Sequence, residues 1–257
     1  MTPHPELFEG NSDLSHLRRY DPKLVEALRR WSRRIDHPVY GIPNRQPPVK
    51  PTESDHIIAQ LCRSVNLCGE IELRPRYYFS PGEKERFASY RDAVLVQSTC
   101  LNAKHTLPAK NWPADRMQRV VNFLRQTHRV VQIGHPSDTL LEHVSDARGK
   151  FSLRETAAIV GNALFFVGLV GFLMHLARAV NTRSVIVYGG REHPLQSGYT
   201  ANENLYREER CSPCGIEADC EIGHPCMQAI TPSDVKDAIE RLQNRLASPL
   251  EVAKVLL

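Results

Sequence analysis

One stretch, Phe151 to Gly190, limits the folds open to this chain more than any other part of the sequence. Ser152 and Glu155 form an S-x-x-E capping box, in which the hydroxyl and the carboxylate satisfy free amides at the start of a helix. The box therefore predicts a helix that begins near Leu153, and the stop signals that follow predict its end near Asn162.

A short apolar run and a glycine-containing turn come next. The run from Leu164 to Val167 has the length and composition of a fully buried strand. Gly168 and Gly171 would then let the backbone turn tightly into a second helix, predicted over Phe172 to Val180. Because the amides at a helix start form an anion site, this order of elements indicates a nucleotide-binding protein.

The same region has an alternative interpretation as a membrane span. No residue from Ala157 to Ala177 carries a formal charge, and a window of that length can cross a bilayer. Gly161, Asn162 and His175 interrupt the window, and the capping box suits a shorter helix. We therefore favour the nucleotide-binding layout and keep the membrane span as the alternative.

Composition is that of an ordinary globular protein. The chain has 257 residues, enough for one large domain or two small ones, and 41% of them are apolar and 24% charged. The net charge of +4 is compatible with an anionic ligand and does not indicate nucleic acid binding. No basic segment followed by an apolar core opens the chain, so the expected location is the cytoplasm, including the periphery of the inner membrane.

Strands and helices alternate along most of the chain. Apolar runs predict strands over 93–96, 130–133 and 184–188, with an amphipathic helix over 117–124 and a last helix from Thr231. This alternation is typical of an α/β fold, a Rossmann-like parallel sheet with helices on both faces. We expect this domain over residues 91–257, beside a smaller, mainly helical region over 1–90.

The N-terminal region offers three helices, the last a polar one after Glu83 and Lys84, and no catalytic pattern. One is predicted from Asp21 and Pro22, and a second follows a cap at Ser54 or Asp55. Polar residues directly after the first strand of the sheet are of more interest, since open α/β sheets bind ligands at the carboxyl ends of their strands. These residues are Gln97, Ser98 and Thr99.

Four of the seven cysteines lie close together in the segment CSPCGIEADCEIGHPC. Two thiolates separated by two residues can approach one metal ion, and a second pair can complete a tetrahedral shell, so the segment predicts a structural zinc or iron site. Its ligands would be Cys211, Cys214, Cys220 and Cys226, with His224 able to replace one sulfur. The alternative is a compact loop of reduced cysteines, with or without one oxidised pair.

With these motifs in place, the chain from Asp92 to Leu246 resembles the C-terminal, donor-binding half of the ADP-heptose:lipopolysaccharide heptosyltransferases, which have the GT-B fold. The shared features are K-x-W-P at Lys110 to Pro113, S-L-x-E at Ser152, the segment GFLMHLA, the strand VIVYG and the CSPC segment. The resemblance implies a glycosyltransferase-like protein that binds a nucleotide-diphosphate sugar of the ADP-heptose type. The acceptor would be lipopolysaccharide, another glycan or lipid, or a protein.

The resemblance also implies roles for individual residues. Ser98 and Thr99 would face the phosphates of the donor, and Lys110 would neutralise their charge, with Lys104 as a substitute. Amides at the turn would bind the diphosphate, and His175 would lie near the donor one helical turn further on. The residues of this turn are Gly171, Phe172 and Leu173. Further donor contacts are expected from the loop residues Asp138, Arg191 and Glu192.

Two departures from the family pattern shape the hypotheses. Where the family has an acidic residue, a small hydroxyl residue and a glycine, this chain has Val170, Gly171 and Phe172. The family's N-terminal glycine-aspartate segment, which holds the acceptor-side base, has no counterpart, so the chain is expected to start partway through that domain and no catalytic residue is assigned. It is either a transferase, alone or completed by a companion chain, or a catalytically silent binding or assembly subunit with the same fold.

Overall fold

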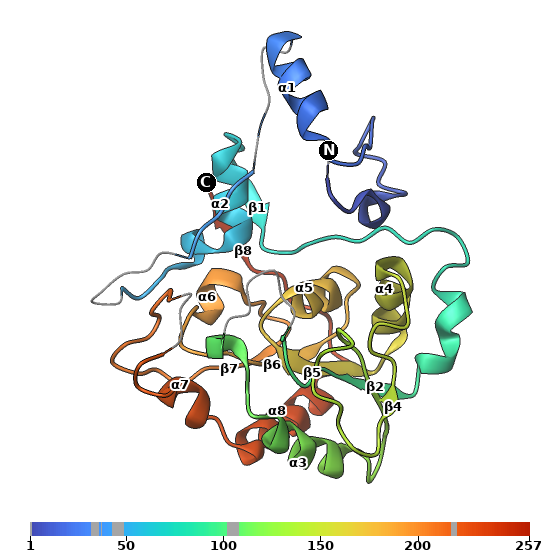
Figure 1. Cartoon of the computed structure of the whole chain (residues 1–257), viewed down its shortest axis with the longest axis vertical. Helices are drawn as coiled ribbons and strands as arrows, with labels where there is room; N and C mark the ends of the chain where they lie inside the picture. Colours follow the sequence, from blue (N-terminus) through green and yellow to red (C-terminus); the bar gives the residue numbers. More distant parts are fainter. Residues whose placement is uncertain (1, 32–35, 37, 43–48, 102–107, 217–219) are drawn as a thin grey trace.

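The computed structural model describes residues 2–31, 36, 38–42, 49–101, 108–216 and 220–257. Its main body is a six-stranded sheet between two layers of helices, and an N-terminal part stands above it (Figure 1). The strands of the sheet are β2 (Ala93–Val96), β3 (Arg129–Gln132), β4 (Ser145–Asp146), β5 (Phe165–Leu169), β6 (Ser184–Val187) and β7 (Glu203–Leu205). The longer helices of this body are α3 (Ala114–Leu124), α4 (Leu153–Asn162), α5 (Phe172–Ala179) and α8 (Pro232–Asn244).

All neighbouring strands of this sheet are parallel, in the order β4-β3-β2-β5-β6-β7. The chain therefore builds outward from β2 to one edge and then returns to place β5 on the other side of β2. Leu95 of β2 lies in register with Val131 on one side and Phe166 on the other. This is the strand order of dinucleotide-binding folds, which bind their ligands where the direction of winding reverses.

Both faces of the sheet are covered, which explains why its central strands are apolar throughout. Val94 and Val96 pack in the core between the sheet and helices α3 and α8, whereas Ala93 and Leu95 pack in the core between the sheet and helices α4 and α5. Figure 1 shows the same two layers, with α3 and α8 below the sheet and α4 and α5 above it. The predicted fold class, a Rossmann-like parallel sheet with a smaller N-terminal part, is confirmed.

The stretch that dominates the sequence folds as α4, β5 and α5 in succession. The capping box of Ser152 and Glu155 is present at the start of α4, and α5 begins directly after Gly171. The membrane-span interpretation was wrong, because the uncharged window is divided among these three elements. Gly168 was also misassigned, since it lies inside β5 rather than in a turn. Over the described residues, no helix combines the length and apolarity that a bilayer crossing requires.

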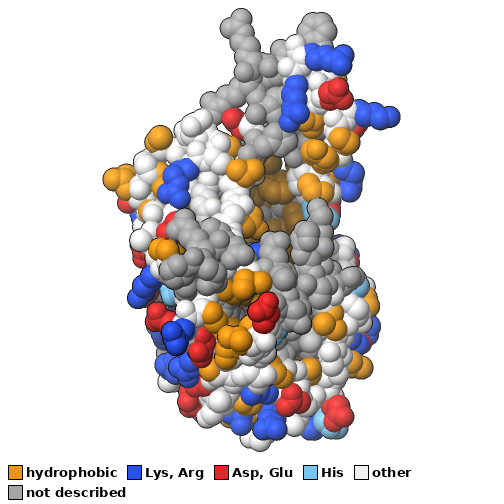
Figure 2. Space-filling model, turned by 60° about the vertical axis from the view of Figure 1, so that its left-hand side comes forward, with side chains coloured by type: hydrophobic (Ala, Val, Ile, Leu, Met, Phe, Trp, Pro, Cys, Tyr) orange, Lys and Arg blue, Asp and Glu red, His pale blue; other side chains and the backbone are white. Residues whose placement is uncertain are grey.

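The N-terminal part contains α1 (Pro22–Trp31) and α2 (Ile57–Ser64). The cap of α2 is His56, whose ring accepts a hydrogen bond from the amide of Ile58, rather than the predicted Ser54 or Asp55. A two-stranded antiparallel ribbon joins the segment after α2 to the C-terminal end of the chain, formed by β1 (Glu70–Glu72) and β8 (Lys254–Leu256). In space-filling view, hydrophobic side chains line a hollow between the upper part of the molecule and the body below it (Figure 2).

Remaining short elements connect these parts. They are the helices α6 (Pro194–Ser197) and α7 (Pro225–Gln228) and the 3₁₀ turns η1 (Pro5–Phe8), η2 (Glu53–Asp55), η3 (Glu85–Tyr90) and η4 (Pro108–Lys110).

Arg154 of α4 connects the first residues of the chain to the body. Its guanidinium forms a bidentate ion pair with Glu83, with N–O distances of 2.8 and 2.5 Å, and donates to the carbonyl oxygens of Glu6 at 2.7 Å and Tyr78 at 3.2 Å. Both side chains of the ion pair are almost buried, 13% and 12% exposed. Removing one partner of such a pair leaves a poorly solvated charge.

We expect Arg154→Met to lower the free energy of unfolding by about 3 kcal/mol, because Glu83 would lose its counterion in a desolvated position. Urea denaturation followed by circular dichroism measures the change. The control is Arg76→Met, which breaks the ion pair with Glu72 where the arginine is 61% exposed and should cost less than about 1 kcal/mol. Equal effects of the two substitutions would contradict the role given to Arg154.

Candidate nucleotide-sugar site

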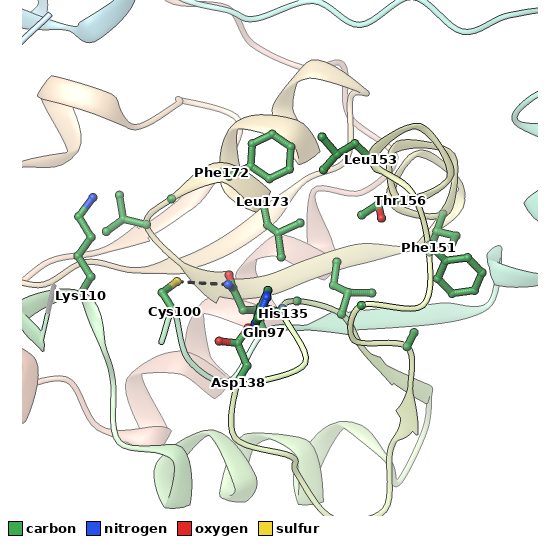
Figure 3. Close-up of a pocket in the computed structure, with 17 residues that line it drawn as sticks. Gln97, Cys100, Lys110, His135, Asp138, Phe151, Leu153, Thr156, Phe172 and Leu173 are labelled. Carbon is green, nitrogen blue, oxygen red and sulfur yellow. Dashed lines mark hydrogen bonds between the residues drawn. The ribbon is translucent and has the colours of Figure 1, made fainter. Parts of the chain in front are cut away.

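A cavity of about 400 Å³ lies at the carboxyl ends of β2, β3 and β5, where the winding of the sheet reverses (Figure 3). Each strand contributes the residues that directly follow it, among them Gln97 after β2, His135 after β3 and Gly171 after β5. This is the position at which open parallel sheets bind nucleotides.

The two ends of the cavity differ in chemistry. Lys110 lies at one end and Phe151 at the other, with Leu153 and Thr156 of α4 near the aromatic end (Figure 3). Most of the wall is apolar, formed by residues such as Ile159. A ligand with a flat apolar group at one end and a negative charge toward the other would match this arrangement.

The start of α5 opens into the cavity. Gly171, Phe172 and Leu173 all line it, and no side chain caps the helix. The first amides of a helix have no carbonyl partner within the helix, and they carry the positive end of its dipole. The structure therefore places amide donors for an anion in the same cavity as Lys110.

Lys110 forms a close ion pair with Glu192, a residue of the loop that follows β6. Glu192 is 4% exposed, and Arg191 lies 3.6 Å from the same carboxylate. Burial alone would raise the pKa of Glu192, but the ammonium of Lys110, with help from Ser197 and Arg191, holds it below its ordinary value. The carboxylate is therefore ionised and neutralises the lysine in the absence of a ligand.

Gly189 makes this ion pair possible. A Cβ atom at position 189 would lie 1.9 Å from the carbonyl oxygen of Ala109, the residue before Lys110. The turn that carries Lys110 can approach the end of β6 this closely because residue 189 has no side chain.

Ser98 and Thr99 are buried in the loop network below the cavity. The Ser98 hydroxyl donates to the carbonyl oxygen of Thr139 at 2.5 Å, and the Thr99 hydroxyl contacts Asp138 at 3.3 Å. Neither residue lines the cavity, whereas Gln97 and Cys100 on either side of them do. In this structure the two hydroxyls hold the loops after β2 and β3 together, so their predicted contact with phosphates remains a prediction.

Asp138 joins the same two loops and lies at the wall of the cavity. Its carboxylate accepts hydrogen bonds from the amides of Leu101 at 3.1 Å and His135 at 2.9 Å. Cys100 is largely buried nearby, and desolvation raises the pKa of its thiol to about 11. The thiol therefore remains protonated at neutral pH.

His175 lies one helical turn inside α5, and its Nδ1 is 2.6 Å from the hydroxyl of Tyr199. Burial lowers the pKa of His175 to about 4, an effect that Glu192 opposes and that His56 and Lys110 reinforce. The imidazole is therefore neutral at physiological pH. Lys104, the predicted substitute for Lys110, lies outside the described residues.

The four clustered cysteines line a second cavity of about 440 Å³, together with His224. All four are free thiols, and the Sγ of Cys226 accepts a hydrogen bond from the amide of Gly190 at 3.0 Å. Within the described ranges, which omit residues 217–219, no three His, Cys, Asp or Glu side chains are placed to share one ion. The four predicted ligands thus line one cavity, but over the described residues they are not close enough together to coordinate a single ion.

Several cavity residues were not identified from the sequence. Cys100, His135, Phe151 and Thr156 lack any motif, and they come together because loops after separate strands converge. The position of His135, two residues after a predicted strand, is the one signal that could have indicated it.

Comparisons with known proteins identify the family and the fold. The family model described as glycosyltransferase family 9 (heptosyltransferase) matches residues 80–223, more than half of the chain. A comparison with curated proteins gave no match.

Solved structures with a similar fold include ADP-heptose lipopolysaccharide heptosyltransferase II of E. coli, at 19% identity and a TM-score of 0.51 over 66% of this chain and 54% of that one. The family 9 glycosyltransferase of Veillonella parvula gives 18% identity and a TM-score of 0.51 over the same shares. The iron-containing dodecameric glycosyltransferase TibC of enterotoxigenic E. coli gives 22% identity and a TM-score of 0.52, over 60% of this chain and 46% of that one. The chain thus spans about half the length of the structures that it matches.

Gly189→Ala should lower the free energy of unfolding by about 1–3 kcal/mol and weaken the Lys110–Glu192 pair, because the added methyl group would collide with Ala109. The matched control is Gly171→Ala, since a Cβ atom there would meet no atom within 4 Å. Thermal denaturation of both variants measures the difference. A Gly189→Ala protein as stable as wild type would contradict the close approach.

Proposed function

Because the chain belongs to glycosyltransferase family 9, the heptosyltransferases, we propose that it binds a nucleotide-diphosphate sugar of the ADP-heptose type in the cavity at the switch point. The observation that carries the proposal is that Lys110 and the uncapped start of α5 line the same, mostly apolar cavity. In the proposed complex, the nucleobase lies toward Phe151 and the diphosphate lies between Lys110 and the amides of Phe172 and Leu173. TibC, which shares the fold, has been crystallised with ADP-D-β-D-heptose, which makes ADP the first ligand to test.

The chemistry of sugar transfer suits these residues. When the bond between the sugar and the diphosphate breaks, negative charge builds on the departing nucleoside diphosphate. A fixed ammonium and the positive end of a helix dipole stabilise that charge more than they stabilise the intact donor. Lys110 and α5 would thus act on the leaving group, while Glu192 holds the lysine in place before the donor binds.

The acceptor side of the reaction is proposed from the family alone. We infer that the sugar passes to a hydroxyl of lipopolysaccharide or of a protein, and that a carboxylate base outside the assigned residues accepts the proton of that hydroxyl. The chain spans about half the length of its structural relatives. A companion chain that supplies a further Rossmann half is part of the proposal.

The binding proposal predicts that ADP titrated by calorimetry binds the wild-type chain and binds a Lys110 variant about 10- to 100-fold more weakly, as expected for the loss of a charge-assisted contact. Lys110→Met alone would leave Glu192 buried without its counterion, so the informative variant is Lys110→Met with Glu192→Gln. Lys236→Met with Glu240→Gln, both in α8 on the far side of the sheet, removes the same pair of charges and should bind ADP as wild type does.

Wild-type protein that shows no heat of binding with ADP would refute the donor site. Unchanged affinity in the paired variant would refute the role of Lys110. Binding without sugar transfer, in the presence and absence of a companion chain, would favour the catalytically silent subunit.

We also propose that the cysteine segment binds a structural zinc or iron ion. The support is the gathering of Cys211, Cys214, Cys220 and Cys226 around one space, with no disulfide among these residues. A shell of four thiolates leaves no open position for a substrate, so this ion would stabilise the segment and take no part in transfer.

Elemental analysis of purified protein should therefore find about one equivalent of zinc or iron, as a four-thiolate site requires. Cys214→Ser should reduce the metal content and the melting temperature, and Cys62→Ser, in α2, should change neither the content nor the ADP affinity. Metal-free protein whose melting temperature does not respond to a chelator would exclude the ion.

A further inference from the structure

The contact between His175 and Tyr199 has a defined direction. The Tyr199 hydroxyl lies 2.6 Å from Nδ1 of His175, and the two rings meet edge to face with centroids 5.7 Å apart. Tyr199 is 4% exposed, and within the described part of the chain its hydroxyl has no other hydrogen-bonding partner. Either the tyrosine donates to Nδ1, or Nδ1–H donates to the tyrosine.

The second arrangement would leave the buried tyrosine O–H without an acceptor, which is costly in a desolvated position. Burial also raises the pKa of Tyr199, so the hydroxyl keeps its proton at neutral pH. The hydroxyl therefore donates to Nδ1 of His175. Because a neutral imidazole carries one proton, that proton must be on Nε2.

His175 is not itself one of the residues that line the donor cavity, but it lies close enough to Lys110 and Glu192 for their charges to act on its ring. His175 lies four residues after Gly171, so both lie on the same face of α5, and helical side chains lean toward the N-terminus of their helix. That end of α5 lines the donor cavity. Across the residues with described positions, Nε2 makes no protein hydrogen bond, and it does not belong to the buried atoms left unpaired, so it retains contact with solvent.

Tyr199 is itself held from two other directions. Its carbonyl oxygen accepts hydrogen bonds from the amide of Asn202 and the side chain of Asn204, both at 3.0 Å. On the N-terminal side, the ring of His56 lies 5.7 Å from the tyrosine ring, and Nε2 of His56 donates to the carbonyl oxygen of Gly198 at 3.0 Å. These contacts fix the tyrosine independently of any ligand.

We propose that Tyr199 is a positioning residue, which fixes His175 as an Nε2–H donor to the diphosphate of the sugar nucleotide. The proposal rests on the donor site proposed above. It adds a residue that does not touch the donor and that acts through the proton position of one that does. A neutral N–H donor can bind a phosphate oxygen beside Lys110 without adding a second buried positive charge to the cavity.

The test combines a spectroscopic and a binding measurement on the full chain at pH 7. Long-range ¹H–¹⁵N correlation spectra of ¹⁵N-histidine-labelled protein report which ring nitrogen of His175 carries the proton, with assignment by His175→Gln. Wild type should show the neutral Nε2–H form. Tyr199→Phe, which removes the hydroxyl and keeps the ring, should show a mixture of both neutral forms and should bind ADP about three- to tenfold more weakly.

The control is Tyr188→Phe, which removes another buried hydroxyl, whose partners are Met174 and Ser197 rather than His175. It should keep the wild-type histidine spectrum and ADP affinity, even if the two tyrosine variants lose similar stability. A wild-type spectrum showing Nδ1–H or an imidazolium would overturn the proposal, as would a Tyr199→Phe protein with unchanged spectrum and affinity. Failure of wild type to bind ADP would instead refute the donor site itself, and the spectrum would still decide the direction of the Tyr199 hydrogen bond.

Discussion

The pairing of β2 with β5 is the contact on which the remaining structure depends. Val94 lies opposite Phe165 and Val96 opposite Val167, so the two halves of the sheet meet along these strands. The loops after β2 and β5 leave this seam in different directions, and the space between them becomes the cavity. A seam buried on both faces needs continuously apolar strands, and this requirement explains why the same sequence resembles a membrane span.

Burial at the cavity also explains why its charged side chains are paired. Lys110 and Glu192 are removed from most solvent, and each is tolerable there because of the other. A diphosphate entering the cavity would offer Lys110 a second anionic partner in a region of low dielectric, where such contacts are stronger than in water. In the proposed complex, the contribution of Lys110 to the free energy of donor binding is therefore a difference between two interactions. One is its ion pair with the diphosphate, and the other is its ion pair with Glu192.

Local signals in the sequence predicted much of the fold. The capping box at Ser152 and the apolar run over β2 depend on residues that are neighbours in the chain, so the start of α4 and the bounds of β2 agree with the structure. The strands β4 and β7 have two and three residues, too few to show a period. Gly168 was read as a turn residue because sequence alone does not reveal that its neighbours pair on both sides.

The site was less predictable for a related reason. Lys110 and the start of α5 were indicated by motif and by resemblance, and the structure brings them to one cavity. The hydroxyls of Ser98 and Thr99 were expected to face a ligand, but they bond to the loop containing Asp138 and Thr139, some forty residues later. Contacts of this kind depend on how loops converge in space, which no local pattern encodes.

The same reasoning applies to the link between the N-terminal region and the donor cavity. His56 precedes α2, yet its ring packs against Tyr199 and its Nε2–H holds the carbonyl oxygen of Gly198. Burial lowers the pKa of His56, which keeps the ring neutral and able to accept from the Ile58 amide while it donates to Gly198. The contact of His56 with Tyr199 therefore joins the two regions expected to divide near residue 90, in addition to the ion pair of Arg154 with Glu83. The division predicted from sequence thus cuts through buried contacts that only the folded chain brings together.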